Sequence, residues 1–281
     1  MIILCSPRAL MRWRRSLLRE GVRVGMVPTM GALHDGHRSL MRRARLSCDA
    51  VLVSLFVNPK QFGPQEDFAR YPRAFRADAE LCRQEGVDAL YAPTLETMYP
   101  SGYQTRVTVR EIAQRWEAAA RPHHFEGVAT VVTKLLTAAR PDAAFFGQKD
   151  YQQAAVIRRL VADLDLDVTV QVCPTVREAD GLAMSSRNAY LTPVQRKAAT
   201  VLYAALRAGR DAVRRGVKEG SKVTRVMRVV VAREPLAAVD YLALCDPTTL
   251  EPLRRAKTPA VFLGAIRLGR VRLIDNLLLS R

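Results

Sequence analysis

The sequence predicts an α/β protein, with a mainly parallel sheet in an N-terminal domain and a smaller α+β domain after it. Over the first 175 residues, short apolar runs alternate with helical patterns, which is typical of βαβ units. Near Thr175 this alternation ends, and a long helical pattern followed by short apolar runs begins. A length of 281 residues is enough for two domains. We therefore expect domains at 1–175 and 176–281.

Five apolar runs predict the strands of the parallel sheet. They lie at 22–30, 49–59, 88–93, 142–147 and 167–176. Helical patterns lie between and after them, at 37–48, 75–87, 127–140 and 151–166. Ligands of such sheets bind outside the carboxyl ends of the strands. Residues that follow the strands are therefore the candidates for a functional site.

The remainder of the chain predicts a mixed arrangement. Thr192 as an N-cap and Pro193 at the first helical position predict a long helix over 192–216. The segment 219–234 is compatible with either helix or strand. Short strands are expected at 238–246, 260–269 and 270–279, and a Gly-Arg turn joins the last two.

The composition indicates a globular protein of a reducing compartment. Hydrophobic residues make up 49% of the chain and charged residues 25%. No apolar run reaches the length of about 18 residues that a membrane span needs, and the N-terminus lacks the apolar core and cleavage site of a signal peptide. The five cysteines are scattered without a C-x-x-C pair, which argues against a zinc ribbon or a disulfide framework. We expect a cytoplasmic protein without a membrane partner.

The net charge of +17 is the unusual global property. Residues 1–175 carry 24 Lys and Arg against 18 Asp and Glu, whereas residues 176–281 carry 20 against 9. These basic residues are mostly arginine and lack the interleaved aromatic side chains of a nucleic-acid platform. Solvated surface arginines, or the attraction of small polyanionic substrates, explain the charge. We therefore expect no nucleic-acid partner.

The stretch PTMGALHDGH, which runs from Pro28 to His37, holds two of the four histidines. It has three interpretations: a metal site, an ordinary strand-to-helix turn, or a phosphate site. A metal site needs a third ligand, and no Cys, His or Glu cluster with metal-ligand spacing is nearby. Gly31 and Gly36 let the backbone approach a ligand, the helix start offers N–H groups and a positive dipole end, and imidazoles add directional donors. The pattern favours a phosphate site and leaves the other two open.

Amide side chains follow the second predicted strand. Asn58 and Gln61 lie in the loop FVNPKQFGPQEDFARYPR, which is rich in Pro and Gly. Amides can recognise hydroxyl groups and carboxylates without adding a buried charge. Simple turn formation at Asn58-Pro59 is an equally good explanation of Asn58.

Two later motifs offer positive charge and hydroxyl groups. In FFGQKDYQQ, Lys149 follows a strand and can hold a phosphate as a point charge, although a solvated lysine is the alternative. In READGLAMSSRNAYL, the side chains of Ser185, Ser186 and Arg187 suit a triphosphate tail. Taken alone, this second motif is more often an N-cap and a loop.

These four motifs, in this order, closely resemble those of the pantothenate synthetase (pantoate–β-alanine ligase) family. DPTTLEPL and RLIDNLLL are also similar to its C-terminal domain, so the resemblance spans nearly the whole chain. The H-x-G-H element alone indicates only the wider nucleotidylyltransferase superfamily, which shares its domain with class I aminoacyl-tRNA synthetases. The resemblance implies a Rossmann-like domain at 1–175 that binds ATP and pantoate, and a smaller domain at 176–281 that closes over the site.

The resemblance also implies a reaction, in which pantoate, β-alanine and ATP give pantothenate, AMP and pyrophosphate. The pantoate carboxylate would attack the α-phosphorus of ATP, and the amine of β-alanine would then attack the acyl carbon of a pantoyl-adenylate. Negative charge builds on the phosphates, so positioning and charge stabilisation would dominate catalysis. The alternatives are an adenylate-forming ligase for another acid and a basic nucleic-acid-binding protein with a degenerate nucleotide fold.

The family pattern assigns roles to individual residues. Six residues are implied in catalysis: His34, His37, Lys149, Ser185, Ser186 and Arg187. The implied ATP site comprises these six and Pro28, Thr29, Met30, Gly31, Gly36, Asn58, Gly147, Gln148, Asp150, Val176 and Met184. Pantoate would contact Met30, Gln61 and Gln153. Mg²⁺ would accompany ATP, Asp78 is associated with the metal, and a homodimer is expected.

The chain departs from the family pattern at one place. The family usually reads RPGHF, whereas this chain reads RPHHF from Arg121 to Phe125. Histidine in place of the glycine removes strain-free access to positive φ. We assign no role to His123 or His124 from the sequence.

Overall fold

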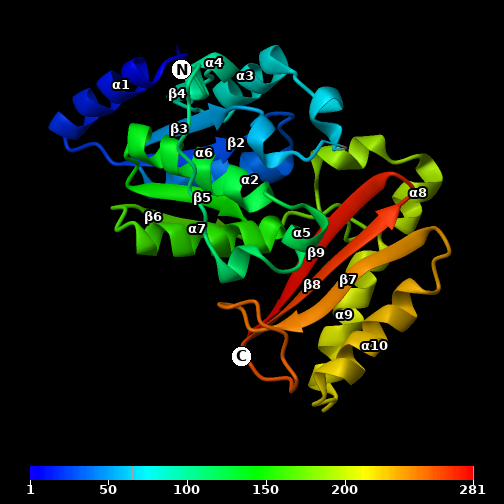
Figure 1. The fold of residues 1–281 in the computed structure, drawn as a ribbon. Helices are drawn as coiled ribbons and strands as arrows, with labels where there is room; N and C mark the ends of the chain where they lie inside the picture. The colour runs from blue at the N-terminus through cyan, green and yellow to red at the C-terminus, as the bar shows by residue number, and fades with distance from the viewer. Residues whose placement is uncertain (65, 281) are drawn as a thin grey trace. The chain divides into compact units, whose positions relative to one another are not determined.

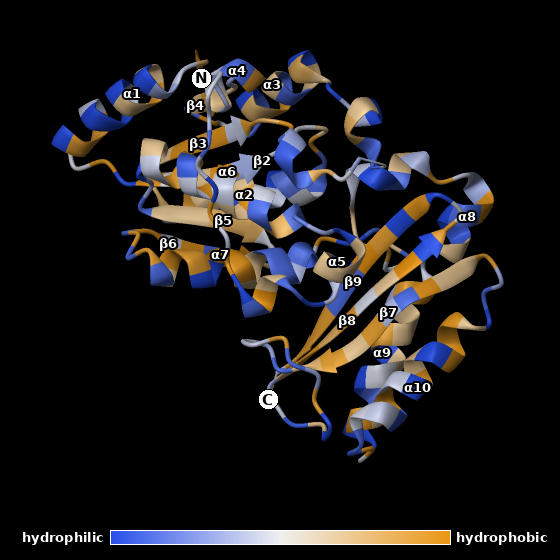
Figure 2. Cartoon of the chain, viewed as in Figure 1, coloured by the Kyte–Doolittle hydropathy of each residue, from blue (hydrophilic) through white to orange (hydrophobic). Residues whose placement is uncertain are grey.

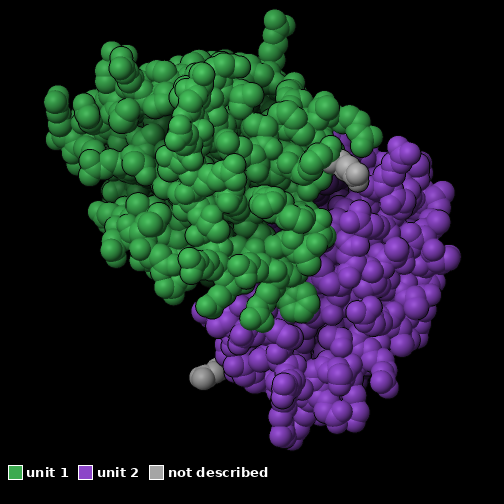
Figure 3. Space-filling view, in the orientation of Figure 1, with its two compact units in different colours: residues 1–147, 153–174 green, residues 148–152, 175–281 purple. Residues whose placement is uncertain are grey.

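The computed structural model describes residues 1–64 and 66–280, and the chain divides into two compact units. Unit 1 comprises Met1–Gly147 and Gln153–Pro174, and unit 2 comprises Gln148–Gln152 and Thr175–Arg281. Figure 3 colours the two units separately. The segment Gln148–Gln152 therefore groups with unit 2, although the sequence pattern places it in the first domain.

Unit 1 is built on a six-stranded parallel sheet, in the order β1-β4-β3-β2-β5-β6 (Figure 1). The strands are β1 (Ile2–Leu4), β2 (Val24–Thr29), β3 (Ala50–Leu55), β4 (Ala89–Tyr91), β5 (Ala143–Gly147) and β6 (Thr169–Cys173). The predicted Rossmann-like α/β fold is confirmed. Because the chain order reverses beside β2, the carboxyl ends of β2 and β5 flank the switch point at which such sheets bind ligands.

Helices cover both faces of this sheet. The helices of unit 1 are α1 (Pro7–Arg19), α2 (Asp35–Ser47), α3 (Phe75–Gln84), α4 (Leu95–Met98), α5 (Glu117–Ala120), α6 (His124–Ala139) and α7 (Tyr151–Asp163). Met26 and Leu52 belong to the hydrophobic cluster formed with α1 and α6, whereas their neighbours Val27 and Val53 belong to the cluster formed with α2 and α3. Burial on both faces explains why the strands are continuous apolar runs, and β3 is mainly hydrophobic in Figure 2.

The sequence pattern predicted no element before residue 22, where the structure has β1 and α1. The strand is only three residues long, and the helix is rich in arginine. Ser6 caps α1 by accepting the N–H of Ala9 at 3.2 Å, and Pro7 occupies the first turn. Arg14 is buried and pairs with Asp142 at 2.9 Å. This pairing attaches the helix to the start of β5.

Unit 2 is an antiparallel sheet of three strands with helices packed on it. The strands are β7 (Ala237–Cys245), β8 (Ala260–Leu268) and β9 (Val271–Leu279), in that order. The helices are α8 (Pro193–Ala198), α9 (Val201–Arg214) and α10 (Gly220–Val231). One hydrophobic cluster joins α9 and α10 to the sheet. This arrangement confirms the predicted smaller α+β part of the fold.

The helices of unit 2 differ from the prediction in two ways. The expected helix over 192–216 is two helices in the structure, because the helical conformation is interrupted at Ala199 and Thr200. The Thr200 hydroxyl donates to the Lys197 carbonyl at 2.9 Å, a local bond that competes with regular helix. The predicted Thr192 cap is present, in a capping box with Gln195. The ambiguous segment 219–234 is helical.

None of the helices within residues 1–64 and 66–280 combines the length and the apolar character that crossing a membrane requires.

Candidate active site

A buried carboxylate on α3 holds the loop between β2 and α2. Asp78, which is only 3% exposed, accepts the backbone N–H of Ala32 at 3.0 Å and of Leu33 at 2.8 Å, one on each oxygen. Gly31 has a φ of +86°, and a Cβ atom there would lie 2.9 Å from the Asp78 carboxylate. Each Asp78 oxygen thus accepts one hydrogen bond from the loop, and the association of Asp78 with a metal stays a prediction. Asp78 fixes the backbone that leads into the two histidines.

His34 and His37 cap α2 through their Nδ1 atoms. His34 Nδ1 accepts the N–H of Gly36 at 3.1 Å, and His37 Nδ1 accepts the N–H of His34 at 3.2 Å. This is a reciprocal capping box made by two imidazoles whose centroids lie 4.2 Å apart. Because Nδ1 is the acceptor in both rings, each neutral ring carries its proton on Nε2. The helix start thus holds two Nε2–H donors in a fixed tautomer.

Gly36 is part of the same capping arrangement. A Cβ atom at this position would lie 2.8 Å from the His34 ring, closer than carbon atoms approach one another without a shift. The turn between the two histidines therefore needs glycine for space, and its φ is not the reason.

Asn58 and Gln61 form a buried amide pair after β3. Asn58 is 1% exposed and donates through Nδ2 to Gln61 Oε1 and to the Gly127 carbonyl, both at 3.0 Å. Its Oδ1 accepts the Tyr99 hydroxyl at 2.9 Å and the Lys60 N–H at 3.3 Å. The whole amide is thus used inside the protein. The predicted contact of Asn58 with the nucleotide does not fit, and Asn58 instead orients Gln61.

This contact decides where the donor end of the Gln61 amide lies. Gln61 Oε1 accepts from Asn58, and Nε2 at the other end donates to Met30 Sδ at 2.9 Å. Gln61 is 7% exposed. The structure therefore brings together Met30 and Gln61, two of the residues expected at pantoate.

A charged network before α6 holds the backbone of Gln61. Its carbonyl accepts His124 Nδ1–H at 2.8 Å and Arg121 Nη2–H at 3.1 Å, and Arg121 pairs with Glu66 at 2.5 Å. Burial, assisted by the Arg121 charge, lowers the pKa of His124 to about 4, so its ring is neutral at pH 7. His123, in place of the family glycine, adopts a φ of +68°. The loop thus keeps its left-handed turn, which histidine tolerates better than most residues.

Three other predicted residues of unit 1 lie at strand ends, and a fourth lies on a helix. Pro28 and Thr29 end β2, where the Thr29 hydroxyl donates to the Ser54 carbonyl at 2.7 Å. Gly147 ends β5, and a Cβ atom there would meet no described atom within 4 Å. Gln153 lies in the first turn of α7.

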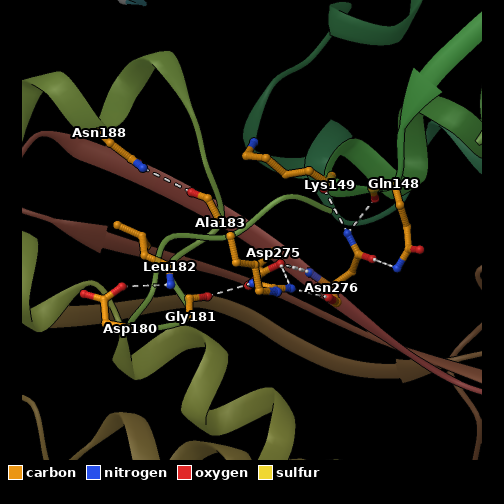
Figure 4. Close-up of polar contacts among 10 residues, drawn as sticks. Gln148, Lys149, Asp180, Gly181, Leu182, Ala183, Asn188, Asp275 and Asn276 are labelled. Carbon is orange, nitrogen blue, oxygen red and sulfur yellow. Dashed lines mark hydrogen bonds and ion pairs between the residues drawn. The ribbon is translucent and has the colours of Figure 1, made fainter. Parts of the chain in front are cut away.

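In unit 2, Gln148, Lys149 and Asp150 form a short 3-10 turn. Asn276 of β9 donates through Nδ2 to the carbonyls of Gln148 and Lys149 at 2.8 and 2.9 Å (Figure 4). The Lys149 ammonium lies 3.4 Å from the Asp150 carboxylate, and the lysine side chain is 20% exposed. The turn is thus fixed through its backbone, and the lysine side chain extends from it.

The serine-arginine motif lies in a folded-back loop of the same unit. Met184 N–H donates to the Val176 carbonyl at 3.0 Å, which returns the chain beside its starting point. Ser185 Oγ accepts the Arg187 N–H at 3.3 Å and caps the 3-10 helix Ser186–Tyr190. Ser185, Ser186 and Arg187 thus lie together at the start of one short helix.

A family model described as pantoate-beta-alanine ligase matches residues 3–278. The chain belongs to the pantoate–β-alanine ligase family. It is 51% identical over 274 residues to a pantothenate synthetase of Pelotomaculum thermopropionicum, covering 98% of this chain and 96% of that protein. The predicted resemblance is confirmed across the chain.

Solved structures of the pantoate–β-alanine ligase family have the same fold. The pantothenate synthetase of Thermus thermophilus superposes with a TM-score of 0.95 at 47% identity and covers all of both chains. A pantoate–β-alanine ligase from Francisella tularensis, complexed with β-γ ATP and β-alanine, has a TM-score of 0.82 at 35% identity, over 99% of this chain and 97% of that one.

Metal binding by protein side chains finds little support in this member of the ligase family. No group of three or more His, Cys, Asp or Glu side chains in the described part of the chain could hold a metal ion. The side chains of residues 1–64 and 66–280 therefore do not form a magnesium cage. An Mg²⁺ ion would take its ligands from ATP phosphates and water, as this ion prefers.

Sequence reasoning missed the ligase residues that hold the predicted ones in place. They are Tyr99, Arg121, His124, Gly127, Asp275 and Asn276. One signal was available in RLIDNLLL, where an Asp-Asn pair interrupts an apolar strand. Buried polar side chains in such a strand must find hydrogen-bond partners, so this pair marks a site of long-range contacts.

Proposed function

We propose that the chain uses ATP to condense pantoate with β-alanine into pantothenate, through a pantoyl-adenylate, with release of AMP and pyrophosphate. Membership of the pantoate–β-alanine ligase family supports the overall reaction. The relative complexed with β-γ ATP and β-alanine supports two of the substrates. The observation that carries the mechanism is the pair of Nε2–H donors on His34 and His37.

In the first step, a carboxylate oxygen of pantoate bonds to the α-phosphorus, and the bond from that phosphorus to the pyrophosphate oxygen breaks. Negative charge grows on the α-phosphate oxygens and on pyrophosphate. Two neutral imidazole donors at the positive end of α2 stabilise such charge without a prior proton transfer. We assign His34 and His37 to the α-phosphate for this reason.

The basic and hydroxyl residues of unit 2 suit the leaving group. Lys149 acts as a point charge, while Ser185, Ser186 and Arg187 supply hydroxyl groups, N–H groups and a guanidinium for the β- and γ-phosphates. The remaining residues proposed to contact the nucleotide are Pro28, Thr29, Met30, Gly31, Gly36, Gly147, Gln148, Asp150, Val176 and Met184. Asp150 is assigned to the ribose.

Pantoate is assigned to the amide side of unit 1. Gln61 Nε2–H donates to a hydroxyl or carboxylate oxygen of pantoate, the Met30 thioether contacts its apolar part, and Gln153 adds a second amide. Neutral amides suit this role because they bind oxygen atoms without neutralising the carboxylate that must attack phosphorus.

In the second step, the amine of β-alanine attacks the acyl carbon of the adenylate and loses a proton as the amide forms. AMP leaves with the electron pair of the acyl C–O bond. AMP is a good leaving group, so the chemistry needs no protein nucleophile, and orientation of the two reactants supplies most of the acceleration.

We also propose Mg²⁺ as the companion of ATP, a homodimer as the working form, and the cytoplasm as its location. Light scattering coupled to size exclusion tests the homodimer, and a monomer at micromolar concentration would contradict it. Titration of activity with Mg²⁺ in the presence of ATP tests the metal requirement, and full activity in excess chelator would contradict it.

The direct test of the reaction is product formation from defined substrates. Pyrophosphate should be released from ATP only when pantoate is present, and AMP and pantothenate should follow when β-alanine is added. Release driven by a different carboxylic acid, with pantoate inert, would indicate another adenylate-forming ligase. Salt-dependent nucleic-acid binding with no ATP turnover would indicate the nucleic-acid alternative.

A further inference from the structure

Asn276 of β9 holds the backbone on which Lys149 stands. It is 1% exposed. Its Nδ2 donates to two successive carbonyls, those of Gln148 at 2.8 Å and Lys149 at 2.9 Å, and its Oδ1 accepts Gln148 Nε2–H at 3.1 Å. One side chain therefore makes three hydrogen bonds to the segment Gln148–Asp150. These bonds fix the peptide planes on both sides of the Lys149 Cα, and with them the direction in which its side chain leaves.

Asp275, the preceding residue, holds the start of the serine-arginine loop. Its carboxylate, 4% exposed, accepts Arg177 Nη1–H at 2.6 Å and Nη2–H at 2.9 Å in a two-bond fork, together with the Asn276 N–H at 2.8 Å. Burial raises the pKa of Asp275, and the Arg177 guanidinium opposes that shift. The paired, hydrogen-bonded geometry favours the ionised form.

Arg177 connects Asp275 to the serine-arginine loop itself. It donates to the Gly181 carbonyl at 3.0 Å, and its guanidinium lies 3.7 Å from the Tyr203 ring centroid. Gly181 has a φ of +94°, and a Cβ atom there would lie 2.7 Å from Tyr203. Asn188, beyond the serines, donates to the Ala183 carbonyl at 3.1 Å (Figure 4). The loop is thus closed on both sides of Met184–Arg187.

We propose that Asp275 and Asn276 are positioning residues that set two phosphate-binding segments, Gln148–Asp150 and Met184–Arg187, in one fixed geometry. This inference rests on the proposed function of those segments. Both side chains are buried and spend their hydrogen bonds on protein groups, so they act through Lys149 and the serines and not on substrate. Stability alone is a poor reason for the buried ion pair of Arg177 and Asp275, because apolar residues of similar volume often replace such ion pairs without loss of stability.

The test is the half reaction, pantoate-dependent exchange of pyrophosphate into ATP. Asn276→Ala should lower its kcat about 10- to 100-fold, because a displacement of about 1 Å at a catalytic group has effects of that size. The KM for pantoate, assigned to unit 1, should stay within about two-fold of the original. In the Lys149→Ala background, the same substitution should cost less than about three-fold, since the lysine it positions is absent.

The matched control is Asp240→Asn on β7 of the same sheet. Asp240 pairs with Arg267 at 2.9 Å and Arg272 at 2.6 Å, and we expect its exchange activity to be unchanged. If Asn276→Ala does not give folded protein, Asn276→Asp keeps the volume, removes the two N–H donors and carries the same expectation.

Equal losses in the wild-type and Lys149→Ala backgrounds, or no loss in either, would overturn the positioning role. Absence of pantoate-dependent exchange in the unaltered protein would instead overturn the proposed function, so the two failures are distinguishable.

Discussion

The two groups of candidate site residues are held in place by different physical means. In unit 1, the Gln61 side chain is oriented by the neutral amide of Asn58, and its carbonyl is held by the neutral His124 ring and by the Arg121 guanidinium, which pairs with Glu66. In unit 2, the segment of Lys149 is fixed by Asn276, and the serine-arginine loop by a buried ion pair. The neutral amide of Gln61 suits a substrate that is bound through hydroxyl and carboxylate oxygens. The positive charges of Lys149 and Arg187 suit phosphates, which are negatively charged.

The difference also predicts how much stability each group of residues loses when one partner is removed. Removing one neutral partner in unit 1 leaves an unsatisfied buried group, which costs about 1–3 kcal/mol. Removing one side of the Arg177–Asp275 pair leaves a buried charge, which costs about 3–5 kcal/mol. We expect selective loss of pantoate use from defects around Gln61, and loss of adenylation from defects around Lys149 and the serine-arginine loop.

Lys149→Ala should have the largest effect on the reaction. It removes the point charge proposed for the leaving phosphates, so adenylate formation should fall about 10³-fold, while the far-ultraviolet circular dichroism stays the same. Pyrophosphate exchange measures the loss. Unchanged turnover would remove Lys149 from the mechanism and contradict the proposed binding of phosphates by the residues of unit 2.

The neutrality of His124 gives a pH prediction for unit 1. Its pKa is about 4 in the folded chain, against about 6.5 when unfolded. The neutral His124 ring therefore contributes fully to the free energy of unfolding above pH 6.5. This contribution is lost as the pH falls from 6.5 towards 4, and the free energy of unfolding then decreases by up to about 3 kcal/mol.

The matched variant is His124→Asn, which can keep a donor to the Gln61 carbonyl without a titrating ring. Urea unfolding at a series of pH values should show a shallower acid decline for this variant. Parallel stability curves for the two proteins would contradict a buried neutral histidine.

His34 allows capping and catalysis to be separated. His34→Ala and His34→Asn should both lower exchange about 100-fold, because both remove the Nε2–H donor. Only the alanine variant should lose the N-cap, at a cost of about 1 kcal/mol in unfolding free energy. Activity retained by His34→Asn would show that the cap, and not the donor, is what the reaction needs.

Gln61→Ala should act mainly on pantoate. Loss of one amide donor should raise the KM for pantoate about ten-fold and leave that for ATP nearly unchanged. Steady-state kinetics with each substrate varied in turn measures both values. A selective loss of ATP affinity would assign Gln61 to the nucleotide and contradict its proposed contact with pantoate.

Asp78→Asn should have the smallest effect on catalysis. One of its two backbone hydrogen bonds is lost, so unfolding free energy should fall by about 1–2 kcal/mol. The Mg²⁺ concentration at half-maximal activity should not change, because the carboxylate serves the loop. A ten-fold rise in that concentration would restore Asp78 as a metal ligand.

Much of the fold could be predicted because its causes are local. Met26 and Val27 face opposite clusters, so β2 is apolar throughout and visible as a run. His34, Gly36 and Lys149 could be named because their spacing follows a family motif. The roles of Asp78, Asn58 and Asn276 could not, because their partners are distant in sequence. Asp78 and Ala32 are 46 residues apart, and Asn276 and Lys149 are 127 apart.

The central claim is that the pantoate carboxylate is activated at the α-phosphate of ATP. Pantoate labelled with ¹⁸O in its carboxylate, incubated with ATP and β-alanine, tests it directly by mass spectrometry of the products. We predict one ¹⁸O atom in each AMP and none in pyrophosphate, because the acyl C–O bond breaks when the amine attacks. Label in pyrophosphate or orthophosphate, with AMP unlabelled, would contradict the adenylate mechanism.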